Sequence, residues 1–151
     1  MTTLARYCLP EDILLAAPVN DRQQLFRYAA EHVERVYGLS AEGVCQRLDE
    51  RECLGSTGLG LGVAIPHARI PGLSHVHVLF VQTAQSIPFN APDAKPVSKF
   101  FIMLMPEHAG KEHLQLLADA ARLLGQRDFR EPLRTAVSRQ DVASLLESYA
   151  E

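Results

Sequence analysis

Residues 51–69, RECLGSTGLGLGVAIPHAR, hold the residue types in this chain that can do chemistry. His67 follows Pro66, and a short apolar run at 63–65 leads into both. A neutral imidazole is nucleophilic near pH 7, so a histidine can accept and return a phosphoryl group. If one ring nitrogen donates to a backbone carbonyl, the other stays free for attack. Proline restricts the backbone before the ring, and a strand there would hold the ring on a rigid element.

The glycines of the same segment admit three interpretations. A dinucleotide-binding fingerprint needs G-x-G-x-x-G at the start of a helix, but Gly58, Gly60 and Gly62 are spaced by two and followed by Val. A Walker A loop needs a Gly-Lys-Ser/Thr ending that this run lacks. The third interpretation is a backbone that offers N–H groups to phosphate oxygens beside His67. Spacing argues against the first two, and the plain alternative to the third is a histidine in a turn.

Two helices are expected before this segment. Asn20 is the expected N-cap of the first, with Gln23 at N3, and Gly38 its end. Ser40 is the expected cap of the second, which runs toward Arg51. The inward-facing residues are predicted to be Leu25, Ala29, Val33 and Val36 in the first helix and Val44 and Leu48 in the second.

Buried strands are predicted at 63–65, 76–83 and 97–105, and helices after them. The first of these helices spans 111–124, and shorter ones follow at 129–136 and 142–149, the last capped by Ser138 or Asp141. This order predicts an α/β fold around one mixed sheet, with residues 1–151 forming a single domain. The expected inward face of the 111–124 helix is Leu114, Leu117, Ala118, Ala121 and Leu124.

Composition limits the classes of function. The 151 residues carry 15 Lys and Arg against 18 Asp and Glu with no basic stripe, which argues against a nucleic-acid partner. Cys8, Cys45 and Cys53 are odd in number and lack C-x-x-C spacing, so we expect reduced thiols in a cytoplasmic protein. The N-terminus lacks the apolar core of a secretory signal. The uncharged stretch at 70–92 contains prolines and polar residues, so membrane insertion is not expected.

The segment GSTGLGLGVAIPHAR is similar to the active-site signature of the fructose/mannitol-type enzyme IIA of bacterial phosphotransferase systems. The similarity continues over nearly the whole chain. Within that family the chain most resembles the nitrogen-regulatory enzyme IIA (EIIA-Ntr), because LPEDILL precedes a capped helix. The matching positions beyond the segment are Pro88-Phe89, Ala91-Pro92-Asp93, Pro96-Val97, Met105-Pro106-Glu107 and His113-Leu114.

The resemblance implies a three-layer α/β/α fold with a mixed sheet. It also implies that His67 is phosphorylated on Nε2, giving tele-phosphohistidine, and that His113 is a second active-site histidine beside it. His113 would open a helix, whose N–H dipoles favour a phosphoryl group. Arg51 matches an arginine that helps to hold the phosphoryl group, a role that suits the guanidinium fork. Without the resemblance, Arg51 would be read as a helix-end cation paired with a neighbouring glutamate.

Ser56, Thr57 and Gly58 occupy positions near the site in the family, and the resemblance implies that they cradle the phosphate. Three positions depart from the family pattern. Leu61 stands where many relatives carry a polar residue, Asn90 stands where Asp is common, and Ser98-Lys99 replace an acidic-apolar pair. None of these departures removes a residue of the transfer chemistry.

The resemblance implies a protein-histidine phosphotransferase component that needs no cofactor. The favoured function is nitrogen-type: a phosphocarrier protein of the NPr or HPr type phosphorylates His67, and the phosphorylation state regulates other proteins such as transporters or kinases. The absence of a fused IIB, IIC or carrier module favours this branch. The alternative is a sugar-specific enzyme IIA that passes the group to a IIB domain. A monomer or weak homodimer is expected.

The other histidines permit a second alternative, a metal-binding or ligand-binding module. His75 and His77 share one strand face, and His67, His108 and His113 could add ligands. No carboxylate lies at a recognised ligand spacing, so we expect packing or solvent-facing roles for His75 and His77 and no metal site. His32, within a helix, and His108, in a turn, are expected at the surface.

Overall fold

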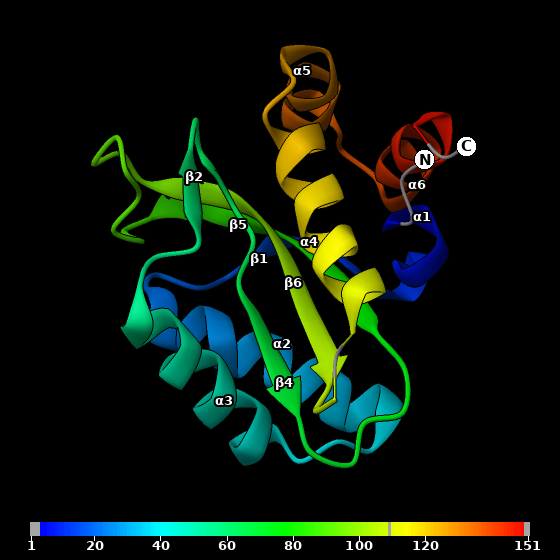
Figure 1. Ribbon diagram of the computed structural model, residues 1–151. Coiled ribbons are helices and arrows are strands. Elements are labelled where there is room, and N and C mark those ends of the chain that lie inside the picture. Colours follow the sequence, from blue (N-terminus) through cyan, green and yellow to red (C-terminus); the bar gives the residue numbers. More distant parts are fainter. Residues whose placement is uncertain (1–3, 109, 150–151) are drawn as a thin grey trace.

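The computed structural model describes residues 4–108 and 110–149. Its centre is a six-stranded sheet with helices on either side (Figure 1). The helices are α1 (Leu4–Tyr7), α2 (Arg22–Tyr37), α3 (Ala41–Leu54), α4 (Lys111–Leu124), α5 (Arg127–Thr135) and α6 (Arg139–Ser148), with a short 3-10 turn, η1 (Pro10–Asp12), before the first strand. The strands are β1 (Ile13–Ala17), β2 (Gly58–Gly60), β3 (Val63–Ala64), β4 (His67–Ile70), β5 (His77–Ile87) and β6 (Val97–Pro106).

The sheet is mixed, as predicted. The strand order is β1-β5-β6-β3-β2, and β4 also pairs with β6. β5 runs antiparallel to β6, whereas β3 and β4 both run parallel to it. Val63 lies opposite Lys99 and His67 lies opposite Met103, so β3 and β4 follow one another along the same edge of β6. The Ile65-Pro66 pair separates them.

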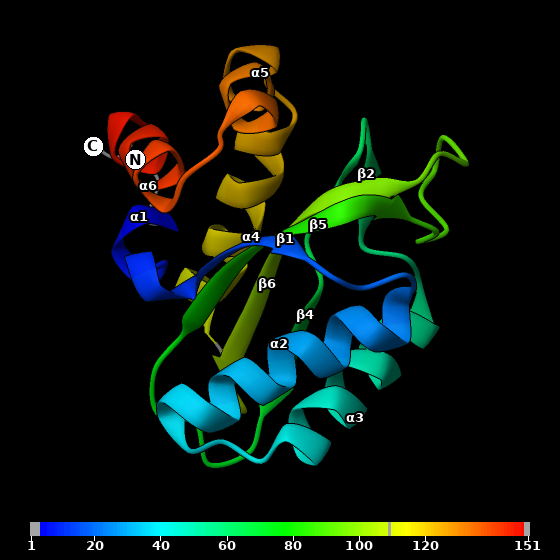
Figure 2. The same ribbon diagram turned by 180° about the vertical axis from the view of Figure 1, so that it is seen from behind.

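Residues on the central strands alternate between two hydrophobic cores, one on each face of the sheet. In β6, Phe100 and Ile102 pack into the core that α2 and α3 cover, and Phe101 and Met103 into the core that α1, α4, α5 and α6 cover. In Figure 1 α4 lies in front of the sheet, and in Figure 2, from behind, α2 lies in front of it. Burial on both faces explains why these strands are continuously apolar. The predicted three-layer α/β/α architecture is confirmed.

The start of α2 differs from the prediction by one residue. Asp21, not Asn20, is the N-cap, and its Oδ1 accepts a 2.8 Å hydrogen bond from the Gln24 backbone N–H. The Gln24 side chain in turn accepts a 2.8 Å bond from the Asn20 N–H. Both residues are good caps, so the sequence alone could not choose between them. Val36, in the last turn of α2, was predicted to face inward but is exposed.

The inward face of α4 was predicted only in part, since Leu117 and Ala121 are partly buried against the core but Leu114 and Ala118 are not. Leu114 is 62% exposed and Ala118 is exposed, whereas Leu124 is buried as expected. The buried face is instead formed by Leu116, Asp119, Ala120, Leu123 and Leu124. Leucines lie on two faces of this helix, so apolar periodicity alone does not fix its rotation. Of the two possible helix caps near 138–141, Ser138 is the cap of α6, and its Oγ accepts from the Asp141 N–H.

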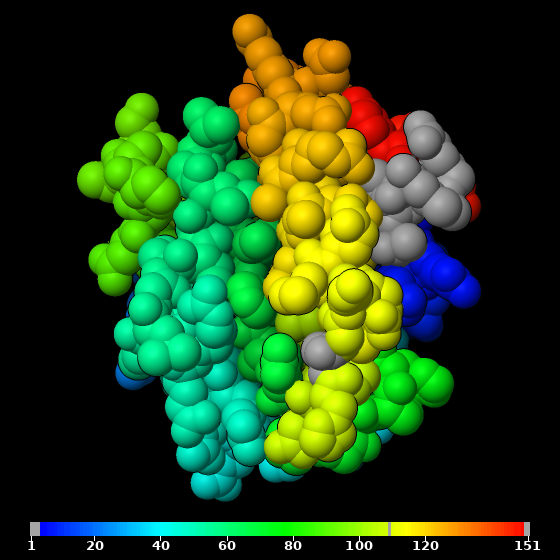
Figure 3. All heavy atoms as spheres, in the orientation of Figure 1, coloured from blue at the N-terminus to red at the C-terminus, as the bar shows by residue number. Residues whose placement is uncertain are grey.

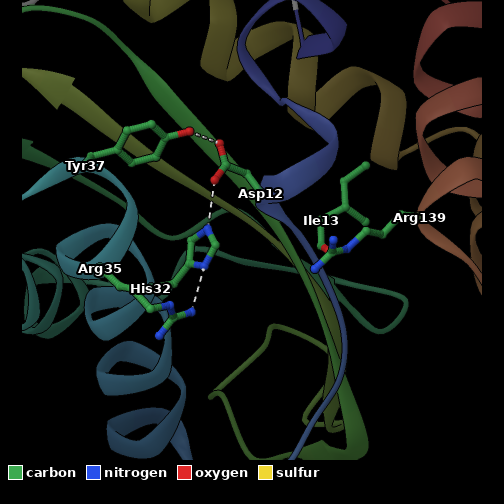
Figure 4. Close-up of polar contacts among 6 residues, drawn as sticks. All are labelled: Asp12, Ile13, His32, Arg35, Tyr37 and Arg139. Atoms are coloured by element: carbon green, nitrogen blue, oxygen red, sulfur yellow. Dashed lines mark hydrogen bonds and ion pairs between the residues drawn. The ribbon is translucent and has the colours of Figure 1, made fainter.

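His32 is buried, at 5% exposure, rather than on the surface as predicted. It lies three residues after Ala29 on the inward face of α2, and its Nε2 lies 2.8 Å from Oδ1 of buried Asp12. The Tyr37 hydroxyl donates to the other oxygen of that carboxylate (Figure 4). The three side chains tie the turn before β1 to α2. Burial of Asp12 without a hydrogen-bond partner would be costly, so His32 and Tyr37 make its position possible.

Several short elements were not predicted: α1, the 3-10 turn, β1, β2 and β4, the last of which begins at His67. β1 pairs in parallel with β5, and Ile13 lies opposite Phe80. Arg139 of α6 donates from Nε to the Ile13 carbonyl at 3.1 Å, which fixes the C-terminal helix to this strand (Figure 4). Among the described residues, no helix has the length and apolar character needed to cross a membrane.

Asp12→Ala should lower the free energy of unfolding by about 3 kcal/mol, because it removes the hydrogen-bond partner of buried His32 and of half-buried Tyr37. Tyr37→Phe should cost about 1 kcal/mol, because His32 still satisfies one carboxylate oxygen. Urea denaturation at neutral pH measures both values. His108→Ala, at an exposed turn, is the control, with an expected change under about 0.5 kcal/mol. Equal effects for Asp12→Ala and the control would contradict this account.

Candidate functional site

A pocket of about 520 Å³ lies where α3, β4 and α4 meet at the edge of the sheet. In Figure 3 a narrow band of green atoms separates the atoms of α3 from those of α4 on this face. The sequence-predicted residues Arg51, His67 and His113 all line the pocket. They come from three different elements, so the tertiary structure brings them together. The other lining residues are Arg47, Glu50, Leu54, Ala68, Arg69, Met105, Leu114 and Leu117.

The tautomer of His67 is set by the backbone. Nδ1 of His67 lies 2.8 Å from the carbonyl oxygen of Ile65, which can only accept, so the ring proton is on Nδ1. Nε2 then carries the free lone pair. Burial lowers the pKa of His67 below its ordinary value of 6.5, the bond to Ile65 opposes this, and the positive charge of Arg51 lowers it further. At neutral pH the ring is therefore a neutral nucleophile.

The tautomer of His113 is set in the opposite sense. The Gly110 N–H donates to His113 Nδ1 at 3.0 Å, so Nδ1 is the acceptor and the proton lies on Nε2. This bond also satisfies an N–H group just before the first turn of α4. The Glu112 carboxylate lies 3.9 Å from the same nitrogen, which is too long for a hydrogen bond. His113 Nε2–H thus remains as a donor.

The two histidines are chemically complementary. The Nε2 of His67 offers a lone pair, and the Nε2 of His113 offers a proton to an oxygen. His67 lies opposite Met103 on β6, and its neighbour Ala68 packs into the α2–α3 core. Strand alternation therefore directs His67 toward the α4 side of the sheet, where His113 begins the helix. An anionic group bound between them would meet a nucleophile and a hydrogen-bond donor.

Arg51 lies in the last turn of α3 and is held by a backbone group. Its Nη1 donates to the Gly55 carbonyl at 2.9 Å. No ion pair joins Arg51 to Glu50 or Glu52 among the described residues, so the helix-end ion pair is not formed there. The guanidinium keeps further N–H donors beside the pocket, where it can hold a phosphate-like anion.

The structure does not place the expected phosphate cradle, Ser56, Thr57 and Gly58, in the lining of this pocket. The Ser56 hydroxyl donates to the Phe89 carbonyl at 3.0 Å, and the Thr57 hydroxyl donates to Glu52 at 2.9 Å. A Cβ on Gly58 would meet Ala91 at 3.0 Å, so glycine is needed there for close packing. The three residues attach the glycine-rich loop to its neighbours.

The three departures from the family pattern lie away from the pocket lining. Leu61 has φ +59° and is 63% exposed, and its N–H donates to the Asp93 carboxylate at 3.0 Å. Asn90 has φ +50°, a conformation that Asn adopts more readily than most residues. The Ser98 hydroxyl accepts a 3.0 Å bond from Lys99 Nζ. These residues belong to the turns and the strand end at the far end of β6.

Sequence reasoning missed the apolar part of the pocket. Leu54, Leu114 and Leu117 line it, and Leu54 is 84% exposed. The signal was present: α4 carries leucines on more than one face, which a helix with one buried face does not need. Arg47 and Arg69 were missed because isolated arginines carry no signal in a chain of mixed charge.

The remaining histidines do not assemble into a metal site. The described residues contain no group of three or more His, Cys, Asp or Glu that could hold a metal ion. His77 is half-buried and stacks on Tyr37 at a ring distance of 4.2 Å, while His75 precedes the strand and is exposed. His108 is exposed in a turn, as expected. All three cysteines are free thiols, as expected.

Comparisons with known proteins agree with this geometry. Residues 6–149 match the family described as phosphoenolpyruvate-dependent sugar phosphotransferase system, EIIA 2. A nitrogen regulatory protein of Bradyrhizobium diazoefficiens is 39% identical over 137 residues, 91% of this chain and 90% of that protein. A fructose-specific EIIA component of Haloferax volcanii is 40% identical over 102 residues, 68% of this chain and 66% of that protein. The crystal structure of the nitrogen regulatory protein IIA-Ntr from Neisseria meningitidis superposes with a TM-score of 0.90 at 40% identity, covering 96% of this chain and 99% of that one.

We expect His67 to titrate with a midpoint below 6.5, because burial and Arg51 both disfavour the charged ring. Between this lowered pKa and 6.5 the unfolded chain binds the proton more readily than the folded chain. His67 therefore does not lower the free energy of unfolding above pH 6.5, and it lowers it progressively as the pH falls from 6.5 toward the lowered pKa. Two-bond ¹H–¹⁵N NMR across pH 4–8 measures the midpoint, and Arg51→Gln should move it upward. A midpoint at or above 6.5 would contradict the burial argument.

Proposed function

This chain belongs to the phosphoenolpyruvate-dependent sugar phosphotransferase system EIIA 2 family, and from that premise we propose that His67 accepts a phosphoryl group from a phosphocarrier protein of the NPr or HPr type. The observation that carries the proposal is the 2.8 Å contact between His67 Nδ1 and the Ile65 carbonyl. It leaves Nε2 unprotonated beside a pocket that Arg51 and His113 also line. As a family member acting on such a carrier, the protein would work in the cytoplasm.

The transfer is an in-line displacement at phosphorus. The bond from His67 Nε2 to phosphorus forms while the bond from phosphorus to the carrier's imidazole breaks. A carrier ring that holds a proton on its other nitrogen leaves as neutral imidazole. The positive charge then arises on the His67 ring, whose Nδ1–H stays on the Ile65 carbonyl. No proton has to move within this protein during the step.

Arg51 and His113 stabilise the group in transfer. The guanidinium donates to phosphoryl oxygens, and its charge offsets their negative charge. His113 donates from Nε2, because the Gly110 N–H occupies its other nitrogen. The first turn of α4 adds backbone dipoles of favourable sign. Catalysis here is positioning and charge stabilisation, and it requires no cofactor on this chain.

We place the protein in the nitrogen-regulatory branch, in which the phosphorylation state of His67 controls binding to other proteins such as transporters or kinases. Support comes from the nitrogen regulatory protein of Bradyrhizobium diazoefficiens and from IIA-Ntr of Neisseria meningitidis, each matched over at least nine-tenths of both chains. The second candidate is a sugar-specific enzyme IIA that passes the group to a IIB domain. The fructose-specific component of Haloferax volcanii favours it, at equal identity over a shorter length.

His67→Ala should abolish phosphorylation, because no other side chain in the pocket presents a neutral nitrogen held in this way. A phosphoenolpyruvate-driven assay with purified enzyme I and carrier measures the label on this chain. His75→Ala, at an exposed position, is the matched control and should label as the wild type does. Full labelling of the His67 variant would remove the acceptor from the proposal.

His113→Ala and Arg51→Gln should each slow transfer about 100-fold while the protein still becomes fully labelled, since each removes a donor to the developing charge. Rapid-quench measurement of the single-turnover rate separates this from a loss of the acceptor. An unchanged rate in either variant would make that residue structural.

The two branches are separated by comparing carriers and onward transfer. The nitrogen-type carrier should phosphorylate the chain at least tenfold faster than the sugar-type carrier, and the label should persist in the presence of a sugar IIB domain. Rapid loss of label to the IIB domain would favour the transport role instead.

A further inference from the structure

Glu52 is a buried carboxylate that the transfer chemistry described above does not use. It is 5% exposed, and Thr57, its partner, is equally buried. Glu52 follows Arg51 in the last turn of α3, so the two side chains leave the helix in different directions. Arg51 lines the pocket, and Glu52 is turned into the glycine-rich loop. Among the described residues Glu52 takes part in no ion pair. A buried carboxylate without a cation is costly, so its bonds must offset that cost.

Both carboxylate oxygens of Glu52 bind one residue. Oε2 accepts from the Thr57 backbone N–H at 2.7 Å, and Oε1 accepts from the Thr57 hydroxyl at 2.9 Å. The backbone N–H can only donate, whereas the hydroxyl can donate or accept, and an ionised carboxylate accepts from both. Glutamine could keep both contacts only by donating its NH₂ group to the hydroxyl oxygen, and both bonds would then lose the charge that makes them strong. Glu52 therefore holds Thr57 through two charge-assisted hydrogen bonds, which glutamine replaces with weaker neutral ones.

Thr57 continues the hydrogen-bonded path toward the site. Its carbonyl accepts from the Ile65 N–H at 3.1 Å. Ile65 lies between β3 and β4, outside the ladder with β6. Its backbone N–H is therefore held by the bond to Thr57 and not by a neighbouring strand. The carbonyl of Ile65 then accepts from His67 Nδ1 at 2.8 Å. Hydrogen bonds thus connect Glu52 to Thr57, Thr57 to Ile65, and Ile65 to the ring of His67.

The other side of the Ile65-Pro66 pair is anchored separately. The Met103 N–H of β6 donates to the Pro66 carbonyl at 2.9 Å. Pro66 has no N–H of its own, so its peptide group with Ile65 has no further backbone donor. The Ile65 carbonyl therefore depends on two supports, β6 on one side and Thr57 on the other. Loss of the Thr57 support would let that carbonyl rotate away from His67.

We propose that Glu52 is a positioning residue that acts through Thr57 and Ile65 to hold His67 as the Nδ1–H tautomer, with Nε2 aimed into the pocket. The inference rests on the proposed function of His67 as the phosphoryl acceptor, and it adds the group that orients this acceptor. Positioning networks of this kind fix the tautomer and direction of a reactive histidine. Glu52 touches neither the phosphoryl group nor the carrier.

The test compares Glu52→Gln with wild type in two measurements. Two-bond ¹H–¹⁵N NMR of the unphosphorylated protein gives the share of the His67 ring in each neutral tautomer. It should change from almost wholly Nδ1–H in the wild type to a mixture in the variant. The maximal rate of phosphoryl acceptance should fall roughly tenfold, as is typical when an outer partner of a reactive histidine is lost, with little change in the KM for the carrier. Glu42→Gln, the same change at an exposed position of α3, should alter neither.

A second set of variants keeps the test decisive if Glu52→Gln does not fold. Thr57→Val removes only the hydroxyl and should change the tautomer share and the rate in the same direction. Thr57→Ser keeps the hydroxyl and should restore both. Tyr37→Phe is the matched control, because it also deletes a hydroxyl bound to a buried carboxylate but has no path to His67. It should lose stability and keep the wild-type tautomer and rate.

The outcomes separate this inference from the proposed function. If the wild type takes no phosphoryl group, the proposed function fails, while the tautomer measurement still tests Glu52 because it needs no carrier. If Glu52→Gln and Thr57→Val lose stability like Tyr37→Phe but keep the Nδ1–H ring and the wild-type rate, the role of Glu52 is only structural and the inference is overturned.

Discussion

The hydrogen bond from His67 Nδ1 to the Ile65 carbonyl requires the chain to leave the edge of the sheet and return to it within two residues. β3 ends at Ala64 and β4 begins at His67, both parallel to β6. The Ile65-Pro66 interruption turns a carbonyl back toward the ring instead of toward the neighbouring strand. In an unbroken strand that carbonyl would accept a hydrogen bond from the neighbouring strand, and the imidazole would be free to rotate. The hydrogen bond that holds the His67 ring depends on this interruption.

The location of the pocket follows from the same edge. A sheet covered by helices on both faces offers access only at its margins, and β4 has one strand neighbour, β6. α3 approaches from one face and α4 from the other, so a donor on each can reach the ring between them. The exposed leucines beside it, Leu54 and Leu114, give the rim an apolar character. That combination suits a pocket whose substrate arrives on another protein, which we propose is the phosphocarrier.

Two buried carboxylates, Asp12 and Glu52, each join a helix to another segment of the chain. Asp12 joins the turn before β1 to α2 through His32 and Tyr37, and Glu52 joins α3 to the glycine-rich loop through Thr57. Each uses both oxygens, which limits the cost of burial. The partners of Asp12 lie in α2, whereas the partner of Glu52 lies in the glycine-rich loop that leads to His67.

The sequence by itself indicated the segment that carries His67, the order of the main helices and strands, and an α/β fold around one mixed sheet, because glycine spacing, Pro66 and apolar periodicity are local properties. The three-layer arrangement was expected only from the family resemblance. The sequence placed His67, His113 and Arg51 together only through a family resemblance. Their meeting in one pocket depends on strand order, which no local pattern encodes. The inward faces of α2 and α4 were misjudged at Val36 and Leu114 for a related reason: periodicity shows that a face is apolar but not what lies against it. Only the tertiary structure decided that Thr57 binds Glu52, since that contact depends on which buried acceptor folding brings within reach.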